Sequence, residues 1–237
     1  MEILSEILLR IDSETVKSFK STTYEIQYFI EEVEKDEEYW RRKLSRYLGF
    51  EVNDKVGKTW RKMYEKVIKY EKDPYEMIKL DYAEILAGLI VQGFDPADDK
   101  NHPVQVACLF GSTNVMKLLL EDSRVDPSAD ENYLIELASE KGRTEIVKML
   151  LKHPKVNPGG GRAANEPIAI ASENGNTEIV KLLLQDGRVN PADRDNRAIE
   201  RAARYNHLDI VKLLLADSRV KESLSEEDYQ KCYSMIN

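Results

Sequence analysis

Cysteine is scarce in this sequence. Its 237 residues include two cysteines, Cys108 and Cys232, which stand far apart and without the CxxC or CxxH spacing of a metal site. Two distant cysteines do not make a disulfide framework, and such frameworks belong to oxidising compartments. The sequence therefore predicts neither disulfides nor a zinc site. It favours a reducing compartment, the cytoplasm first and the nucleus second.

Long apolar runs and an excess of positive charge are also lacking. The apolar N-terminal stretch is interrupted by Glu2, Glu6 and Arg10. No segment approaches the roughly 18 uncharged apolar residues of a membrane span, so we expect neither an export signal nor a transmembrane helix. The net charge is −8, whereas DNA and anionic membranes select for clustered positive charge. Nucleic acid and membrane are therefore not expected as partners.

Short motifs recur along the second half of the chain. An Asp-Pro or Asn-Pro pair returns at steps of 31, 31 and 33 residues, and single alanines and leucine-rich triplets keep similar steps. Self-similarity at a fixed period of this length is typical of a repeat array. The pairs are Asp95-Pro96, Asp126-Pro127, Asn157-Pro158 and Asn190-Pro191, and the alanines are Ala107, Ala138, Ala171 and Ala202.

Each period reads as helix, short turn, helix, long turn. In one period, residues 132–141 predict a first helix, and Gly142 follows as the residue that most easily takes a left-handed conformation. Thr144 is expected to cap the second helix. An apolar stripe then runs along that helix, and stacked neighbours can bury it where a single unit cannot. The stripe is Ile146, Val147, Leu150 and Leu151.

These units resemble ankyrin repeats. The residues from Gly142 to Leu150 read Gly-Arg-Thr-Glu-Ile-Val-Lys-Met-Leu, close to the family's Gly-His-x-Glu-Ile-Val-Lys-Leu-Leu. The resemblance implies an all-α solenoid over residues 74–221, with one degenerate and four clear repeats, and a capping helix over 222–237. The Asn-x-x-Ile spacing and the Arg-Val-Asp-Pro turn are similar to those of ankyrin proteins from large DNA viruses of amoebae.

One family motif is missing. Where ankyrin repeats usually carry Thr-Pro-Leu-His, this chain has His102-Pro103-Val104-Gln105 and, one period later, Tyr133-Leu134-Ile135-Glu136. The histidine at the fourth position of the family motif occurs in none of the four repeats. The sequence therefore predicts the fold but not the hydrogen bonds that usually join one ankyrin repeat to the next.

The N-terminal segment, residues 1–45, resembles an F-box, and residues 46–73 are expected to be a helical linker or cap. Ile7-Leu8-Leu9-Arg10-Ile11-Asp12 is similar to the family's Ile-Leu-x-x-Leu-Asp, and residues 39–44 are similar to its Leu-Trp-Arg-x-Leu end. The resemblance implies docking onto a Skp-type adaptor and its cullin. The alternative is a structural cap on the repeats. The residues implied in adaptor binding are Ile3, Leu4, Ile7, Leu8, Ile11 and Trp40.

The resulting functional hypothesis is a substrate adaptor that recruits a target to a cullin–RING ubiquitin ligase, in a host cytoplasm if the chain is viral. The alternative is a non-catalytic ankyrin scaffold or inhibitor. Neither an enzyme nor a cofactor is expected, because the sequence has no nucleophile–base or metal-ligating constellation. Gly159-Gly160-Gly161 precedes no Lys-Ser or Lys-Thr, so it predicts a flexible loop tip, not a phosphate site.

The ankyrin resemblance also implies where a target binds. Partners of the family contact the tips of the long turns and the exposed side of the first helix. Tyr133 is the favoured residue here, because an exposed aromatic side chain at a loop tip is typical of a binding hot spot. The corresponding positions are His102, Gln105, Tyr133, Glu136, Arg162, Asn165, Arg194 and Arg197.

Overall fold

The computed structural model describes residues 36–48, 51, 59–69, 73–160 and 165–236, and every regular element in these ranges is a helix. The predicted all-α fold is confirmed. The chain divides into an N-terminal unit that ends at Phe94 and a helical stack that begins at Asp95. The helices expected before residue 36 lie outside the described residues. None of the described helices is both long and apolar enough to cross a bilayer.

The N-terminal unit contains four described helices around one apolar core. Leu44 and Val67 are fully buried, as is Ile85. Asp73 caps a helix whose first residue is Pro74, because its side chain accepts a hydrogen bond from the Tyr75 amide. Proline is common at the first position of a helix. The helices are α4 (Glu37–Leu48), α5 (Trp60–Lys69), α6 (Pro74–Lys79) and α7 (Ala83–Val91).

Aromatic side chains join α4 to α5. The Trp40 ring lies 5.1 Å from that of Tyr39 and 5.4 Å from that of Tyr64, centroid to centroid. The Lys43 ammonium lies over these rings, at 5.4 Å from both Trp40 and Tyr64, and donates to the Tyr39 hydroxyl at 3.2 Å. Burial raises the pKa of Tyr39 to about 12. A buried cation is therefore stabilised here by ring faces and one hydroxyl.

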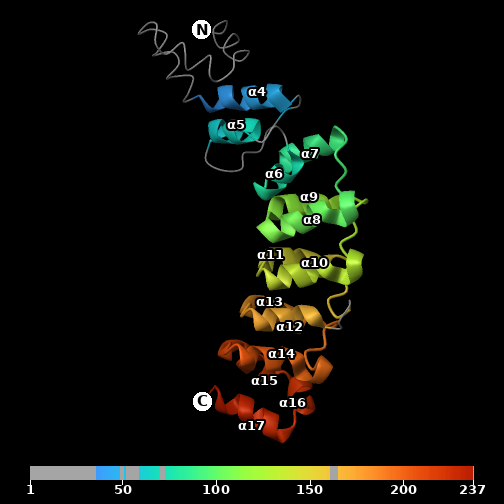
Figure 1. Cartoon of the computed structure of the whole chain (residues 1–237), viewed down its shortest axis with the longest axis vertical. Helices are drawn as coiled ribbons and strands as arrows, with labels where there is room; N and C mark the ends of the chain where they lie inside the picture. The colour runs from blue at the N-terminus through green and yellow to red at the C-terminus, as the bar shows by residue number, and fades with distance from the viewer. Residues whose placement is uncertain (1–35, 49–50, 52–58, 70–72, 161–164, 237) are drawn as a thin grey trace, which may run out of the picture. The chain divides into compact units, whose positions relative to one another are not determined.

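The second unit is a stack of four helix pairs closed by two short helices (Figure 1). First helices contact first helices and second helices contact second helices along the stack. Ser225 caps the last helix by accepting a hydrogen bond from the Asp228 amide, in the pattern of a capping box. The pairs are α8 (Asp98–Phe110) with α9 (Thr113–Glu121), α10 (Ala129–Glu140) with α11 (Thr144–Lys152), α12 (Glu166–Glu173) with α13 (Thr177–Gln185), and α14 (Asp193–Arg204) with α15 (Leu208–Ala216). The closing helices are α16 (Ser218–Ser223) and α17 (Glu226–Ser234).

The stripe predicted on the second helix lies in the core. Ile146, Val147 and Leu150 are fully buried. Gly142 is left-handed, with φ of +66°, and ends the preceding helix as expected. The predicted threonine cap is wrong, because Thr144 is already the first residue of α11 and the capping position belongs to Arg143, without a side-chain cap. Arg143 is instead held by the neighbouring pair, as described below.

A left-handed turn lies within the first residues of three of the first helices, α8, α10 and α14. Three consecutive residues have positive φ at 99–101, at 130–132 and at 194–196. This conformation costs an L-residue about 1–2 kcal/mol, and asparagine tolerates it best. The last residue of the turn is Asn101, Asn132 and Asn196 in these three pairs, and Asn165 at the same place in the other. The recurring asparagine is therefore placed by backbone conformation.

Candidate protein-binding face

The left-handed asparagines link neighbouring pairs across the stack. The Asn132 side-chain oxygen accepts from the Asn157 amide at 2.8 Å, and the Asn165 oxygen accepts from the Asn190 amide at 2.6 Å. Asn101, which is 9% exposed, accepts from the Asp126 amide at 3.1 Å. Each bond crosses 25 residues to the next long turn. We call these three contacts the asparagine bridges. These bridges are hydrogen bonds between repeats. The sequence did not predict them, because the Thr-Pro-Leu-His motif is missing.

A second set of contacts runs through the short turns. Asn176 donates to the Ser139 carbonyl at 2.7 Å, His207 bonds the Glu173 carbonyl at 2.9 Å, and Arg143 donates to the Leu109 carbonyl. Each side chain passes over a glycine of the preceding pair. A Cβ added to Gly175 would lie 2.7 Å from the His207 ring. Glycine is thus required there both for its φ of +72° and for the close approach of the next pair.

Arginines fasten the long turns. Arg188 donates to the carbonyls of Val156, at 2.7 Å, and Leu151, at 2.9 Å, while both oxygens of Asp186 hold its guanidinium group. Arg219 repeats this arrangement one pair later. The paired guanidinium lowers the pKa of Asp186. The long turns are therefore held at fixed positions by charge-assisted bonds, which makes them suitable supports for contact residues.

The described part of the glycine-rich turn packs closely against the next long turn. A Cβ on Gly159 would lie 2.0 Å from the Arg188 carbonyl oxygen, and its amide donates to the Asn157 side chain at 3.2 Å. Its carbonyl accepts from the Asn165 amide. Gly159 therefore allows a close approach of two backbones, and the flexible loop tip remains a prediction. Gly161 lies outside the described residues.

The predicted contact positions on the first two pairs belong to the first helices α8 and α10. His102 is exposed, whereas Gln105 and Glu136 are half-buried. Tyr133 is also half-buried, so it is less exposed than its sequence position suggested. Together with Gln105 it lines a shallow hollow between α8 and α10. Their part in partner binding remains a prediction.

The contact positions of the later pairs are differently arranged. Asn165 is engaged inside the stack, because its amide group donates to Asp193 at 3.1 Å and its oxygen takes part in an asparagine bridge. Arg194 is exposed and Arg197 is half-buried, and both face Glu166. Arg162 lies outside the described residues. Asn165 therefore has a clear structural role, and the two arginines are the more accessible candidates.

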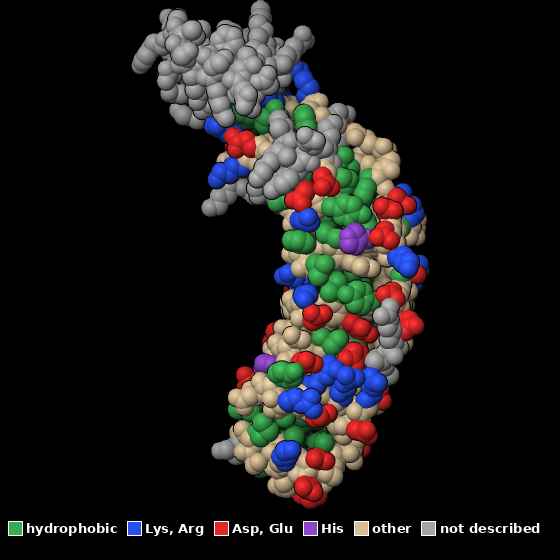
Figure 2. Space-filling model, in the orientation of Figure 1, with side chains coloured by type: hydrophobic (Ala, Val, Ile, Leu, Met, Phe, Trp, Pro, Cys, Tyr) green, Lys and Arg blue, Asp and Glu red, His purple; other side chains and the backbone are tan. Residues whose placement is uncertain are grey.

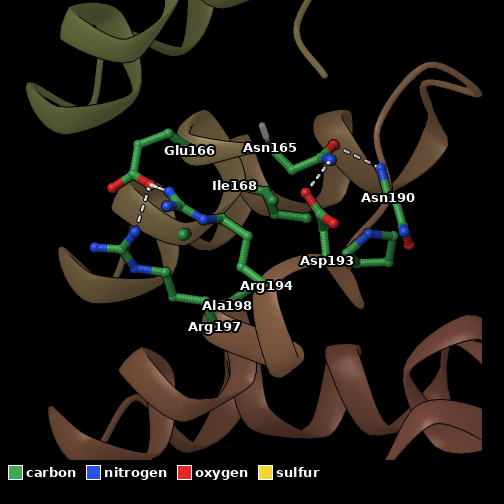
Figure 3. Close-up of a pocket in the computed structure, with 10 residues that line it drawn as sticks. Asn165, Glu166, Ile168, Asn190, Asp193, Arg194, Arg197 and Ala198 are labelled. Atoms are coloured by element: carbon green, nitrogen blue, oxygen red, sulfur yellow. Dashed lines mark hydrogen bonds and ion pairs between the residues drawn. The ribbon is translucent and has the colours of Figure 1, made fainter. Parts of the chain in front are cut away.

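Glu166 and the two arginines border a hollow of about 10 Å³ between α12 and α14 (Figure 3). The Glu166 carboxylate lies 3.0 Å from Arg197 and 3.5 Å from Arg194. Small-molecule sites usually enclose roughly 300–1,000 Å³. This hollow is too small for a cofactor, so its charged rim is better suited to the side chains of another protein.

Some candidate contact residues were not predicted. Phe110 is 54% exposed and Tyr205 is 52% exposed, both at the short turns. Their exposure could not be read from helical periodicity, because each lies at or just beyond the end of a first helix, where the apolar pattern ends. Arg201 was also missed. Its spacing from Arg194 and Arg197, at seven and four residues, is the signal that could have placed it on the same helix face.

No group of three or more metal-ligating side chains gathers within the described ranges. Cys108 is fully buried beside the core alanine Ala107, and burial raises the pKa of its thiol to about 12. A thiol with so high a pKa is a poor nucleophile at neutral pH. It acts as a small core side chain, as its place in the repeat predicts.

The adaptor contacts predicted for Ile3, Leu4, Ile7, Leu8 and Ile11 lie outside the described residues. Trp40 is described and is 6% exposed. It packs between α4 and α5, in a core that also includes Tyr82 and Leu89 from the following helices. Its observed contacts are thus internal to the N-terminal unit, and a contact with an adaptor remains a prediction.

Comparison with known families agrees with this arrangement. A family model described as ankyrin repeats in three copies matches residues 76–159 and again residues 157–223. The two matches together include all four helix pairs and most of α6 with α7. No curated protein matches the chain at a significant level.

Proposed function

The chain belongs to the ankyrin-repeat family, and from that premise we propose that this protein–protein interaction module is a substrate adaptor. In this proposal the repeats hold a target on the side formed by the long turns and first helices. Residues 1–45 recruit a cullin–RING ubiquitin ligase through a Skp-type adaptor. The observation that supports it is the F-box-like pattern Ile7-Leu8-Leu9-Arg10-Ile11-Asp12 at one end of a chain whose other end is an ankyrin stack.

The same proposal places the chain in the cytoplasm, where cullin–RING ligases act, and in a host cell if its likeness to viral ankyrin proteins reflects its source. The reducing environment is consistent with the two unpaired cysteines, Cys108 and Cys232.

One observation favours a second candidate function. Trp40 and Tyr64 share a core with Tyr82 and Leu89, so α4 to α7 form a single apolar cluster. Such a cluster is what a structural cap on a repeat array requires, because the terminal repeat would otherwise expose an apolar face. Under this alternative the chain is a plain scaffold or inhibitor.

The substitution Leu4→Asp separates the two functions. A substrate adaptor must leave Leu4 accessible, so we expect the charge to abolish binding of a purified Skp adaptor while the melting temperature changes little. Under the cap alternative the same carboxylate is buried without a partner, which costs several kcal/mol. Binding is measured by pull-down with the full chain, and melting by circular dichroism.

Leu9→Asp is the matched control, because it introduces the same charge at a position outside the predicted Ile3, Leu4, Ile7 and Leu8 stripe. It is expected to leave adaptor binding intact. Gross unfolding of Leu4→Asp, or failure of the unmodified chain to bind any Skp adaptor, supports the cap and rejects the substrate adaptor.

A further inference from the structure

One carboxylate holds three arginines on the first-helix side of the stack. Glu166, at the start of α12, contacts Arg194, Arg197 and Arg201, which project from α14 or the turn at its start. The distances are 3.5, 3.0 and 2.9 Å. The Glu166 side chain is 13% exposed, whereas those of Arg194 and Arg197 are 44% and 35% exposed. Arg194 and Arg197 are therefore more exposed than the carboxylate that holds them.

The charges within this cluster do not balance. Arg201 is 14% exposed and bridges Glu166 to Glu173, with a distance of 2.9 Å to each. Arg194 and Arg197 share a single oxygen of Glu166. Three arginines thus face two glutamates, which leaves one positive charge in excess, on a chain whose net charge is −8. Figure 2 shows lysine and arginine side chains gathered over this part of the stack.

Asp193, the acidic residue next to Arg194, does not neutralise the excess positive charge of the cluster. The Asp193 carboxylate accepts a hydrogen bond from the Asn165 amide group at 3.1 Å. Figure 3 shows Asp193 on the Asn190 side of the hollow, away from Arg197. Among the described residues, Asp193 makes no ion pair with Arg194 or Arg197.

The shared glutamate also positions the two guanidinium groups. A guanidinium has five N–H donors in a planar fork, and a single shared oxygen occupies few of them. Binding therefore requires little further ordering of Arg194 and Arg197, which lowers its entropic cost. Carboxylates fit such a fork in a bidentate manner.

We propose that Arg194 and Arg197 bind an acidic segment of the target protein, through carboxylates that approach the exposed side of Glu166. The inference rests on the proposed target-binding function of the repeats and specifies the chemistry of the target. The small hollow beside the arginines leaves no room for a separate small ligand, and the excess of one charge is too small for a nucleic-acid surface.

The test is fluorescence anisotropy with a labelled peptide of six glutamates separated by glycines, and with its glutamine analogue. The unmodified full chain should bind the glutamate peptide at least about tenfold more tightly than the glutamine peptide, since bonds between charged groups are the stronger ones. The double variant Arg194→Gln/Arg197→Gln should weaken glutamate-peptide binding by about tenfold or more. Added salt should weaken it further.

The matched control is Lys181→Gln/Lys212→Gln, which removes the same charge from the exposed side of the second helices α13 and α15. It should change the affinity by less than about twofold, because a net-charge effect alone is small. Equal losses in both double variants, or no preference for glutamate over glutamine, would overturn the proposal. Tighter binding of an oligothymidylate than of the glutamate peptide would also overturn it.

Binding of the Skp adaptor is measured on the same double variants and should not change. If the chain binds the Skp adaptor but does not prefer the glutamate peptide to the glutamine peptide, only the proposal of an acidic target is rejected. If the chain prefers the glutamate peptide but does not bind the Skp adaptor, only the proposed ligase function is rejected. A melting temperature close to that of the unmodified chain confirms that Arg194→Gln/Arg197→Gln still folds.

Discussion

Leu150→Ala is expected to lower the free energy of unfolding by about 2–5 kcal/mol. Leu150 is fully buried on α11, and α11 contacts second helices on both sides, α9 and α13. Removing its side chain leaves a cavity among stacked helices, which can close only if neighbouring pairs shift together. The midpoint and slope of urea unfolding, monitored by circular dichroism, give this free energy.

Lys148→Ala is the control on the same helix. Its ammonium group lies 2.7 Å from Glu145, and its side chain is 45% exposed. Exposed pairs of this kind contribute little, so we expect a change below about 0.5 kcal/mol. Similar losses from Lys148→Ala and Leu150→Ala would mean that the buried side of α11 is assigned incorrectly.

Asn101→Ala is expected to lower the free energy of unfolding by about 2–5 kcal/mol, from two sources. The alanine leaves the part-buried Asp126 backbone amide without its acceptor, which costs about 1–3 kcal/mol. It must also adopt the left-handed φ of +65°, which costs about 1–2 kcal/mol. Urea unfolding again gives the value.

Two further substitutions separate these sources. Asn101→Gly keeps the left-handed conformation accessible and removes only the bridge, so it should cost less than Asn101→Ala. Lys100→Ala changes an exposed residue of the same turn, with φ of +57°, and should cost less than about 0.5 kcal/mol. A loss from Lys100→Ala as large as that from Asn101→Ala would contradict a role for the bridge.

The second helices were the most predictable part of the fold. Ile146, Val147 and Leu150 follow a helical period, and Gly142 marks the turn before them, so local sequence determines both the helix and its buried side. The capping box at Ser225 and the helix start at Pro74 were predictable for the same reason. Each depends on residues within one turn of the helix end.

The bridging contacts were not predictable, because they join residues 25 to 37 positions apart. Nothing local to Asn165 indicates that its oxygen meets the Asn190 amide. Nothing local to Arg188 indicates that it reaches the Leu151 carbonyl, 37 residues away. Such pairings depend on how adjacent pairs stack. The charge excess around Glu166 was missed for the same reason, since its partners lie on the next first helix.

We expect the asparagine bridges to couple the helix pairs and so to fix the positions of the long turns on the candidate binding face. Amide hydrogen exchange, measured by nuclear magnetic resonance on the unmodified chain, tests it most directly. The amides of Asp126, Asn157 and Asn190 donate to the bridging asparagines. If the bridges hold in solution, these three amides exchange as slowly as amides within the second helices. Exchange at the rate of an unstructured peptide at these three positions would contradict it.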